Sequence, residues 1–566
     1  MLYTEKPQSR TSLDARRMAI ARQALQSEGR LNGVCAALGF DSEEQALRAV
    51  AESLGLAYVD LSTVKIDRAL LKTFPVRLIH RYNVFPIRQE DERLTLAIAN
   101  PFDLHAVDAV GAATGLCVEP VVAPREELAA VIKMHLGVGA ETIDGLLAQQ
   151  DEEQGVEVVG EVDWDAAEGD SSVQEPSVVR LVNEILVEAV QARASDIHLE
   201  SQADGIRIRY RIDGVLQTQP TPPEINRFHA AIISRLKIMA RLNIAEKRVP
   251  QDGRIKLKVA GREVDVRVSI IPMLHGEGIV LRILDRASMQ FSLRGLGMDA
   301  DVYDKFCRLI TLPHGILLVT GPTGSGKTTT LYSALNEIKS EDTKIITTED
   351  PIEYHLGGIN QIQVHPKVGL TFASSLRSIL RHDPDVILVG EIRDLETAEN
   401  AIQAALTGHL VFSTLHTNDA ASAFLRMVDM GVEPYLVCST VEGVMAQRLV
   451  RVLCRDCRQP YTPRTDELPE DFLAESNGQL DDGLVLYRAV GCRRCRGTGF
   501  SGRVGIFELL ETNDEVRKLA SERAPTNFVK QAAIRAGMRT LRQDGWRKVL
   551  RGITTIEEVL RVTKVD

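Results

Sequence analysis

The stretch ILLVTGPTGSGKTTTLYSAL, residues 316–335, decides the fold class of this chain. Its first residues, 316–320, are apolar or β-branched and predict a buried strand. Residues 321–328 then fit the pattern G-x-x-x-x-G-K-[ST] in full, and residues 329–335 can open a helix. Glycines let backbone N–H groups turn toward an anion, and a helix N-terminus adds a favourable dipole. The stretch therefore predicts a phosphate-binding loop between a strand and a helix, with ATP as its ligand.

Roles within the loop follow from this chemistry. Lys327 is expected to neutralise the β- and γ-phosphates, and the Thr328 hydroxyl to bind Mg²⁺. The nucleotide-binding residues that we expect are Gly321, Pro322, Thr323, Gly324, Ser325, Gly326, Lys327, Thr328 and Thr329.

Three further polar clusters follow predicted strands. Strand 344–348 ends in Glu349-Asp350-Pro351-Ile352-Glu353, strand 386–389 ends in Gly390-Glu391, and strand 410–414 leads to His416. Since ligands bind at the carboxyl ends of parallel strands, we expect these side chains beside the phosphate loop. A Walker B strand ordinarily ends in Asp, so Glu391 has to fill that role here. For His416 a purely structural role remains the alternative.

Length and composition indicate a soluble multidomain protein. At 566 residues the chain is too long for one core, and 44% hydrophobic and 26% charged residues are ordinary values for globular proteins. No apolar run approaches the roughly 20 residues that span a bilayer, and residues 1–10 lack a signal-peptide apolar region. We therefore expect a cytoplasmic protein without direct membrane insertion.

The net charge of -11 is concentrated in one segment. Residues 141–172 contain eleven acidic residues and no Lys or Arg, so the remainder is nearly neutral. Such a self-repelling segment predicts a flexible linker. The near-neutral remainder argues against nucleic acid as a partner.

The segments around the linker differ in periodicity. The expected domains are 1–140 (helical 1–56, α/β 57–140), the linker 141–172, an α+β domain of antiparallel strands at 173–290, and an ATPase domain at 291–566. A turn signal, Asp213-Gly214, separates two strands of the α+β domain.

Four cysteines form two C-x-x-C pairs, Cys454 with Cys457 and Cys492 with Cys495, about 34 residues apart. This pattern predicts a structural Zn²⁺ site closing an inserted subdomain at about 452–500, and a redox-active pair is the main rival. Several arginines flank the cysteines. They are either solvated charge or a docking face for the cytoplasmic loops of a membrane platform protein: Arg451, Arg455, Arg458, Arg493, Arg494 and Arg496.

Taken together, these motifs resemble the type II/type IV secretion ATPases. Residues 321–329, 349–353, 385–394 and 407–416 are similar to the Walker A motif, Asp box, Walker B motif and His box of that family. Segments 207–214 and 244–254 are similar to its second N-terminal domain. The resemblance covers 175–566 closely and the N-terminal third in outline. It is strongest to the GspE branch, the type II secretion motors, on segments 244–247 and 264–269.

The resemblance implies a fold and a set of site roles. The fold is multidomain α/β: a RecA-like P-loop ATPase core preceded by an α+β (PAS-like) domain and a small N-terminal helical plus α/β region, with a zinc-binding insertion. The implied assembly is a homohexamer in which Arg267 and Arg282 of a neighbouring domain stabilise the transferring phosphoryl group. Glu353 would orient or activate the attacking water, Glu391 would act through Mg²⁺, and His416 would sense the γ-phosphate. The alternative for the two arginines is ordinary surface ion pairing.

The implied function is ATP hydrolysis that drives pseudopilus assembly in type II secretion. Expected partners are inner-membrane platform proteins: the cytoplasmic domain of the type II secretion L protein, bound by the N-terminal region, and the F platform protein. The protein would thus be recruited to the inner face of the inner membrane. A type IV pilus extension motor, a nucleic-acid translocase and a nucleotide-binding scaffold without turnover are the alternatives. One departure from the family is Gly278, where Arg is expected, which puts an interface contact in doubt.

Overall fold

The computed structural model describes most of the chain. The described residues are 13–27, 30–61, 64, 66–67, 70–136, 176–259, 262–285, 291–464, 466, 468–475 and 484–564. The predicted acidic linker, 141–172, lies outside them. The chain divides into two compact units, residues 1–284 and 285–566. Among the described helices, none combines the length and apolarity needed to cross a bilayer.

The first unit opens with the predicted helical bundle. Its elements are α1 (Ala15–Ser27), η1 (Asn32–Val34), α2 (Cys35–Leu38) and α3 (Glu43–Ser53). Helix α3 begins where the Ser42 side chain accepts a hydrogen bond from the Gln45 backbone N–H. Leu47 and Val50, spaced for one helix face, are buried in the core of the bundle.

A small α/β module follows, as predicted. Its elements are β1 (Ala57–Tyr58), η2 (Leu70–Lys72), α4 (Val76–Tyr82), β2 (Val84–Glu90), β3 (Arg93–Ile98), α5 (Leu104–Thr114), β4 (Cys117–Val122) and α6 (Arg125–Leu136). The sheet order is β1-β4-β3-β2, with β2 antiparallel to β3 and the other pairs parallel. Strand β3 stops before Asn100-Pro101, where the sequence predicts its end.

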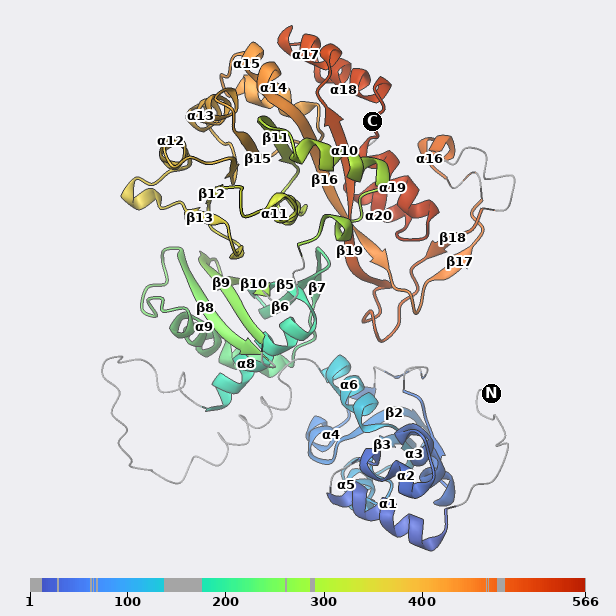
Figure 1. Ribbon diagram of the computed structural model, residues 1–566. Coiled ribbons are helices and arrows are strands. Elements are labelled where there is room, and N and C mark those ends of the chain that lie inside the picture. The colour runs from blue at the N-terminus through green and yellow to red at the C-terminus, as the bar shows by residue number, and fades with distance from the viewer. Residues whose placement is uncertain are drawn as a thin grey trace. The chain divides into compact units, whose positions relative to one another are not determined.

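The predicted α+β fold completes the first unit. Its elements are α8 (Pro176–Gln191), β5 (Ala194–Gln202), β6 (Gly205–Ile212), β7 (Val215–Thr218), η4 (Pro223–Phe228), α9 (His229–Met239), β8 (Gln251–Val259), β9 (Arg262–Met273) and β10 (Gly276–Asp285). The six-stranded sheet has the order β7-β6-β5-β10-β9-β8 (Figure 1). Asp213 and Gly214 form the predicted turn, since Ile212 pairs with Val215.

The second unit alternates strands and helices. Its elements are η6 (Leu293–Leu296), α10 (Ala300–Ile310), β11 (Gly315–Thr320), α11 (Lys327–Ile338), β12 (Ile345–Glu349), β13 (Asn360–Gln363), η7 (Pro366–Val368), α12 (Phe372–Ile379), β14 (Val386–Val389), α13 (Leu395–Leu406), β15 (Leu410–Leu415), α14 (Ser422–Asp429), α15 (Pro434–Thr440), β16 (Val441–Leu453), β19 (Phe500–Glu511), α17 (Asp514–Ser521), α18 (Thr526–Arg535), α19 (Leu541–Leu550) and α20 (Ile556–Val562).

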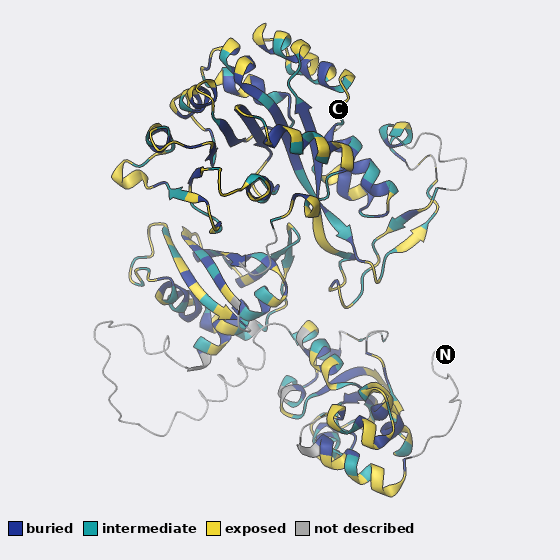
Figure 2. Ribbon diagram, viewed as in Figure 1, coloured by how far each residue is buried: buried dark blue, intermediate teal, exposed yellow. Residues whose placement is uncertain are grey.

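These strands form one sheet of order β13-β12-β14-β15-β11-β16-β19. All neighbours are parallel except β16 and β19. Every residue of β11 is buried: Ile316 and Leu318 pack into one hydrophobic cluster, and Leu317 and Val319 into another. The sheet is therefore covered on both faces, and its central strands β12, β14, β15 and β11 are buried along their whole length (Figure 2). The multidomain α/β fold predicted from the sequence is confirmed.

An insertion between β16 and β19 carries the four clustered cysteines. It contains β17 (Gln459–Tyr461), α16 (Glu470–Glu475) and β18 (Leu486–Arg488), and β17 pairs antiparallel with β18. Phe472 of α16 is buried against Trp546 of α19, with ring centroids 5.4 Å apart at 88°. This core fixes the insertion to the C-terminal helices.

Candidate functional site

The phosphate loop lies where the sequence predicts it, between β11 and α11. Gly321, Gly324 and Gly326 all have positive φ, at 146°, 79° and 92°. A Cβ at Gly321 would lie 2.6 Å from both the Gln447 carbonyl oxygen and the Ser325 hydroxyl. Glycine is thus required at this position both by the backbone conformation and by the space around it.

The Lys327 side chain turns back over the loop. Its Nζ donates hydrogen bonds to the carbonyl oxygens of Gly321, at 2.7 Å, and Pro322, at 3.2 Å. Burial lowers the pKa of Lys327 to about 8, while the nearby Glu391 carboxylate acts to raise it and Arg448 to lower it. A phosphate in the loop would add the negative charge that favours the protonated amine.

Two observations on the loop itself fit a phosphate group. Within the described chain, the Ser325 hydroxyl is buried and makes no hydrogen bond. Buried polar atoms are rarely left unpaired, so this hydroxyl is available to an anion in the loop. Thr328, by contrast, is exposed in the first turn of α11.

Four neighbouring strands bring the predicted motifs to one edge of the sheet. The phosphate loop follows β11, His416 follows β15, Glu391 follows β14, and the segment containing Glu353 follows β12. In the sheet these strands are adjacent and parallel, in the order β12-β14-β15-β11. The carboxyl ends of all four strands therefore face the same edge, as the sequence predicts.

Glu391 is the centre of an ion cluster at this edge. Its carboxylate pairs with the Arg393 guanidinium and lies 3.2 Å from His416 Nε2. Burial acts to raise the pKa of Glu391, but hydrogen bonds and charge from Arg393 and His416 outweigh it, so the pKa is lowered. Glu391 is therefore ionised at neutral pH, as a group that acts on a cation must be.

The predicted arginines lie in the first unit, on neighbouring strands of its sheet. Arg267 is on β9 and Arg282 is on β10. Buried neighbours flank each of them, so both side chains leave the core face of the sheet. Arg282 donates from Nε to Asp196 Oδ1 at 3.1 Å and remains half exposed. The sequence leaves open that the two arginines form ordinary surface ion pairs, and Arg282 does form one. This ion pair leaves the guanidinium accessible.

Strand β16 supplies two residues that sequence reasoning missed. Gln447 Oε1 accepts a hydrogen bond from the Thr330 hydroxyl at 2.7 Å, so it holds the start of α11. Arg448 donates to the carbonyl oxygens of Gln447 and Asn418, both at 3.0 Å, and thus links β16 to the segment after His416. Their only signal in the sequence is that two polar residues stand side by side in the middle of a mostly apolar strand.

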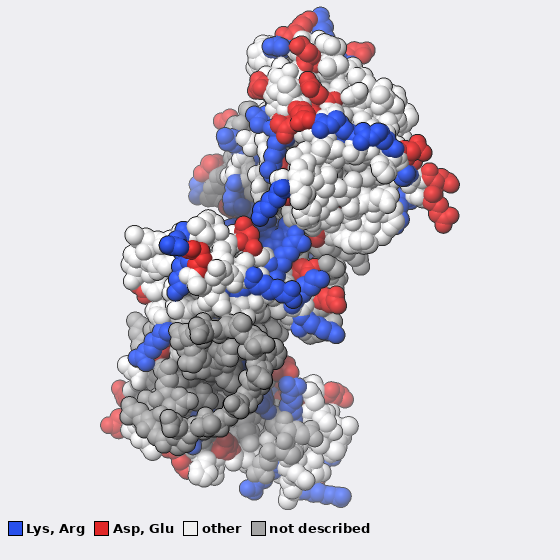
Figure 3. Space-filling model, turned by 90° about the vertical axis from the view of Figure 1, so that its left-hand side faces the viewer, with Lys and Arg blue, Asp and Glu red and all other residues white. Residues whose placement is uncertain are grey.

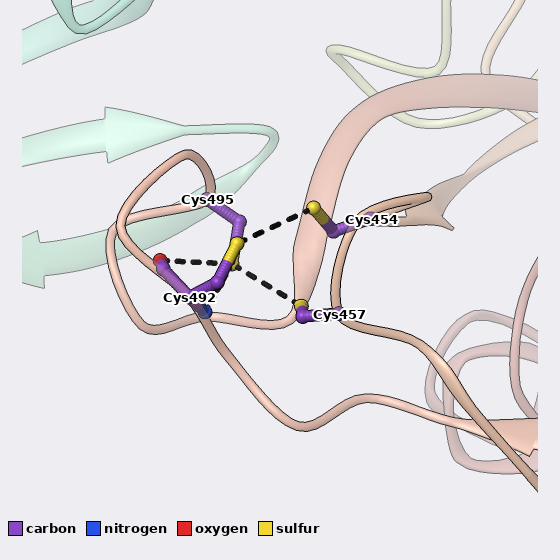
Figure 4. A group of neighbouring side chains, drawn as sticks. All are labelled: Cys454, Cys457, Cys492 and Cys495. Atoms are coloured by element: carbon purple, nitrogen blue, oxygen red, sulfur yellow. Dashed lines mark hydrogen bonds between the residues drawn. The ribbon is translucent and has the colours of Figure 1, made fainter. Parts of the chain in front are cut away.

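The four clustered cysteines converge, as the sequence predicts (Figure 4). Their sulfur atoms all lie within 4.8 Å of one another. The pairs Cys454–Cys492 and Cys457–Cys495 are each 3.8 Å apart, and Cys492–Cys495 is 3.7 Å apart. Four sulfurs about 2.3 Å from a central Zn²⁺ would be separated by roughly 3.8 Å at tetrahedral geometry. The cluster therefore has the dimensions of a Zn²⁺ site.

Backbone donors also suit thiolates at this position. The backbone N–H groups of Cys492 and Gly499 donate to Cys495 Sγ, at 3.1 and 3.2 Å. Burial acts to raise the pKa of Cys495, yet these hydrogen bonds outweigh it and lower the pKa to about 7. All four cysteines are free thiols at distances well beyond a disulfide bond, which favours a metal over the redox-active pair.

A family model described as Type II/IV secretion system protein matches residues 171–561. The chain belongs to this family. A second model, the MshEN domain, matches residues 54–142, which include the small α/β module. The predicted resemblance to the secretion ATPases is thus confirmed, and with it the prediction that this secretion-family protein is an ATP hydrolase.

Relatives from two branches of the family extend along nearly the whole chain. The Type II secretion system protein E of Xanthomonas campestris is 46% identical over 93% of this chain and 92% of its own. The Type IV pilus assembly ATPase PilB of Myxococcus xanthus is 40% identical over 96% of both chains. The X-ray structure of the Yersinia pseudotuberculosis ATPase DotB covers 71% of this chain and 97% of its own, with 21% identity and a TM-score of 0.50, and shares the fold.

Charges of both signs are interspersed on the molecular surface. Figure 3 shows Lys and Arg side chains beside Asp and Glu side chains on one face.

Proposed function

We propose that this protein is the ATPase motor of a type II secretion system, hydrolysing ATP to drive pseudopilus assembly and export of folded proteins. The observation that carries the proposal is the common edge of β12, β14, β15 and β11, which gathers the Asp box, Walker B motif, His box and phosphate loop. The higher identity to the type II secretion relative, 46% against 40%, favours secretion over pilus assembly.

The chemistry at this edge is phosphoryl transfer to water. Lys327 would bind the β- and γ-phosphates, with the Ser325 hydroxyl as a further donor. Thr328 would hold Mg²⁺, with Glu391 acting through it, and the ion when bound would neutralise phosphate charge. Glu353 would orient or activate the water, and His416, next to Glu391, would sense the γ-phosphate.

Zn²⁺ would be held by Cys454, Cys457, Cys492 and Cys495. With four thiolates the ion has no open position, so its contribution is structural. It would join the insertion to β16, since Cys454 follows the end of that strand. Among the arginines near the cluster, Arg451 and Arg458 are already engaged over the rings of Phe500 and Tyr487. Arg494 pairs with Asp456 but is exposed. The docking face for a membrane platform protein would consist of the exposed side chains Arg455, Arg493, Arg494 and Arg496.

The active assembly would be a homohexamer, with Arg267 and Arg282 of one domain completing the site of a neighbouring subunit. We further propose the domains 1–140, 141–172, 173–290 and 291–566, with the cysteine subdomain at about 452–500. The first domain would bind the cytoplasmic domain of the type II secretion L protein, and the F platform protein would receive the motion. The protein would then work at the inner face of the inner membrane, recruited through these partners.

A type IV pilus assembly motor is the second candidate, favoured by the full-length match to PilB. The test is a deletion strain complemented with wild type or with Lys327→Ala. We expect extracellular enzyme secretion to be lost with pili intact, and to be restored by wild type alone, because the variant lacks the main cation for the phosphates. Loss of pili with secretion intact would assign the protein to the pilus branch. Restoration by Lys327→Ala would contradict the ATP site itself.

A further inference from the structure

A buried polar network joins the phosphate-loop helix to the strand that precedes Glu353. The Tyr332 hydroxyl on α11 donates to the Glu349 carboxylate at the end of β12. Thr347 and Gln361 donate to the other carboxylate oxygen, at 2.5 and 3.1 Å. Tyr332 and Glu349 are 0% and 5% exposed, so these bonds form out of contact with water. Hydrogen bonds to a buried carboxylate are among the stronger ones in proteins.

The same network holds the segment that follows Glu353. Gln361 on β13 donates from Nε2 to the Tyr354 carbonyl oxygen at 3.0 Å and accepts from the Leu356 backbone N–H at 2.8 Å. The backbone of Tyr354 and Glu353 also acts on the Tyr332 hydroxyl, because it opposes the rise in the pKa of Tyr332 that burial causes. The residues that directly follow Glu353 are therefore connected, through Gln361 and Glu349, to α11, the helix that begins at Lys327.

An aromatic cluster covers the network. The Phe291 ring lies edge-on to Tyr332, with centroids 5.4 Å apart, and to Tyr354, at 5.7 Å. Its carbonyl oxygen accepts a hydrogen bond from Asn336 Nδ2 at 3.2 Å. Phe291 comes shortly after the end of β10, the strand that carries Arg282. Phe291 thus packs on both tyrosines near the start of the second unit.

We propose that Tyr332, Glu349 and Gln361 are positioning residues that fix Glu353 relative to the phosphate loop. Phe291 covers this network by packing on Tyr332 and Tyr354. The inference rests on the proposed role of Glu353 in orienting water. None of the three residues belongs to the phosphate loop, so we expect their effect to be on the rate of hydrolysis and not on nucleotide affinity.

The test compares Tyr332→Phe with Tyr303→Phe in the full-length protein. Tyr332→Phe removes one hydroxyl from the network, whereas Tyr303, on α10, contributes to the same hydrophobic core outside it. We expect kcat of Tyr332→Phe to fall roughly 10-fold or more, the scale of a lost hydrogen bond to a buried charge, with KM changed less than about twofold. Tyr303→Phe should keep wild-type kcat. A fluorescent ATP analogue should bind both variants like wild type.

A second variant guards against misfolding. Gln361→Met keeps the side-chain length but loses the hydrogen bonds to Tyr354 and Leu356, and it should lower kcat in the same way. The double variant Tyr332→Phe/Gln361→Met should lose less kcat than the product of the two single fold-losses, because both substitutions act through Glu353. Circular dichroism and melting curves identify any variant that is unfolded. Wild-type kcat in a folded Tyr332→Phe or Gln361→Met overturns the proposal.

Glu353→Gln separates this inference from the proposed function. If Glu353→Gln is inactive while Tyr332→Phe is normal, only the network proposal fails. If Glu353→Gln retains wild-type kcat, the proposed role of Glu353 fails, and the positioning inference fails with it.

Discussion

Glu508 gives a prediction in which a single proton changes the stability of the ATPase unit. This residue of β19 is only 1% exposed, and its carboxylate accepts hydrogen bonds from the backbone N–H groups of Ala420, at 2.8 Å, and Leu541, at 3.2 Å. Burial raises its pKa from 4.5 to about 7, with Asp419 also raising it and Lys530 opposing the rise. The carboxyl group thus binds its proton more tightly in the folded chain than in the unfolded one.

The sign of the pH dependence follows from this raised pKa. The stabilisation is complete below about pH 4.5 and is lost as the pH rises through about 7. Between pH 5.5 and 8 the loss amounts to about 2 kcal/mol, from the two pKa values and the linkage relation. For a unit of this size, that corresponds to a melting-temperature change of about 4 °C.

The assay is the melting temperature of the full-length protein at pH 5.5 and pH 8. From pH 5.5 to pH 8 the melting temperature of wild type should fall about 4 °C further than that of Glu508→Gln, since the variant has no proton to release. Glu511→Gln is the matched control, because Glu511 is on the same strand but partly exposed and ion-paired with Arg308. It should keep the wild-type pH dependence. Equal pH dependence in wild type and Glu508→Gln would refute the reasoning.

Three further predictions concern the site and the assembly. Gly321→Ala should abolish binding of a fluorescent ATP analogue, since the added Cβ would lie 2.6 Å from two neighbouring atoms. Gly295→Ala is the control and should bind the analogue normally, because nothing lies within 4 Å of its added Cβ. Equal binding by the two variants would contradict this prediction. Cys495→Ser should lose bound zinc, measured by elemental analysis, and its cysteine insertion should unfold. Cys117→Ser, at an exposed cysteine outside the cluster, should keep the zinc. Zinc retained by Cys495→Ser would contradict the proposed metal site. ATPase activity should rise more than linearly with protein concentration, because sites complete on assembly, and strict proportionality would exclude arginines supplied by a neighbour.

The sequence predicts those parts of the site that depend on local pattern. The strand, loop and helix of residues 316–335 are contiguous, so one stretch specifies all three. The ends of β12, β14 and β15 could be assigned because apolar runs stop at polar residues there. Two C-x-x-C pairs likewise predict that their four sulfur atoms come together, because this is the pattern of a shared metal site.

The residues that sequence reasoning missed depend on which strands become neighbours. Gln447 reaches Thr330 only because β16 pairs with β11, across more than a hundred residues of sequence. The sequence identifies Glu349 as part of the Asp box, but its contact with Tyr332 depends on how α11 packs against the end of β12. Arg393 pairs with Glu391 through a local turn, yet nothing in the sequence separates it from the many solvated arginines.

Charge at the common edge bears on the proposal that arginines come from another subunit. The Arg393 guanidinium is already paired with Glu391, and Arg448 is engaged with carbonyl oxygens of Gln447 and Asn418. Lys327 is thus the cation best placed for the phosphates, since its own partners are only backbone carbonyls that a phosphate can replace. Phosphoryl transfer spreads negative charge over three oxygens and is accelerated by an added arginine. We propose that Arg282 of a neighbouring subunit supplies this additional charge, since its ion pair with Asp196 leaves half of its side chain exposed.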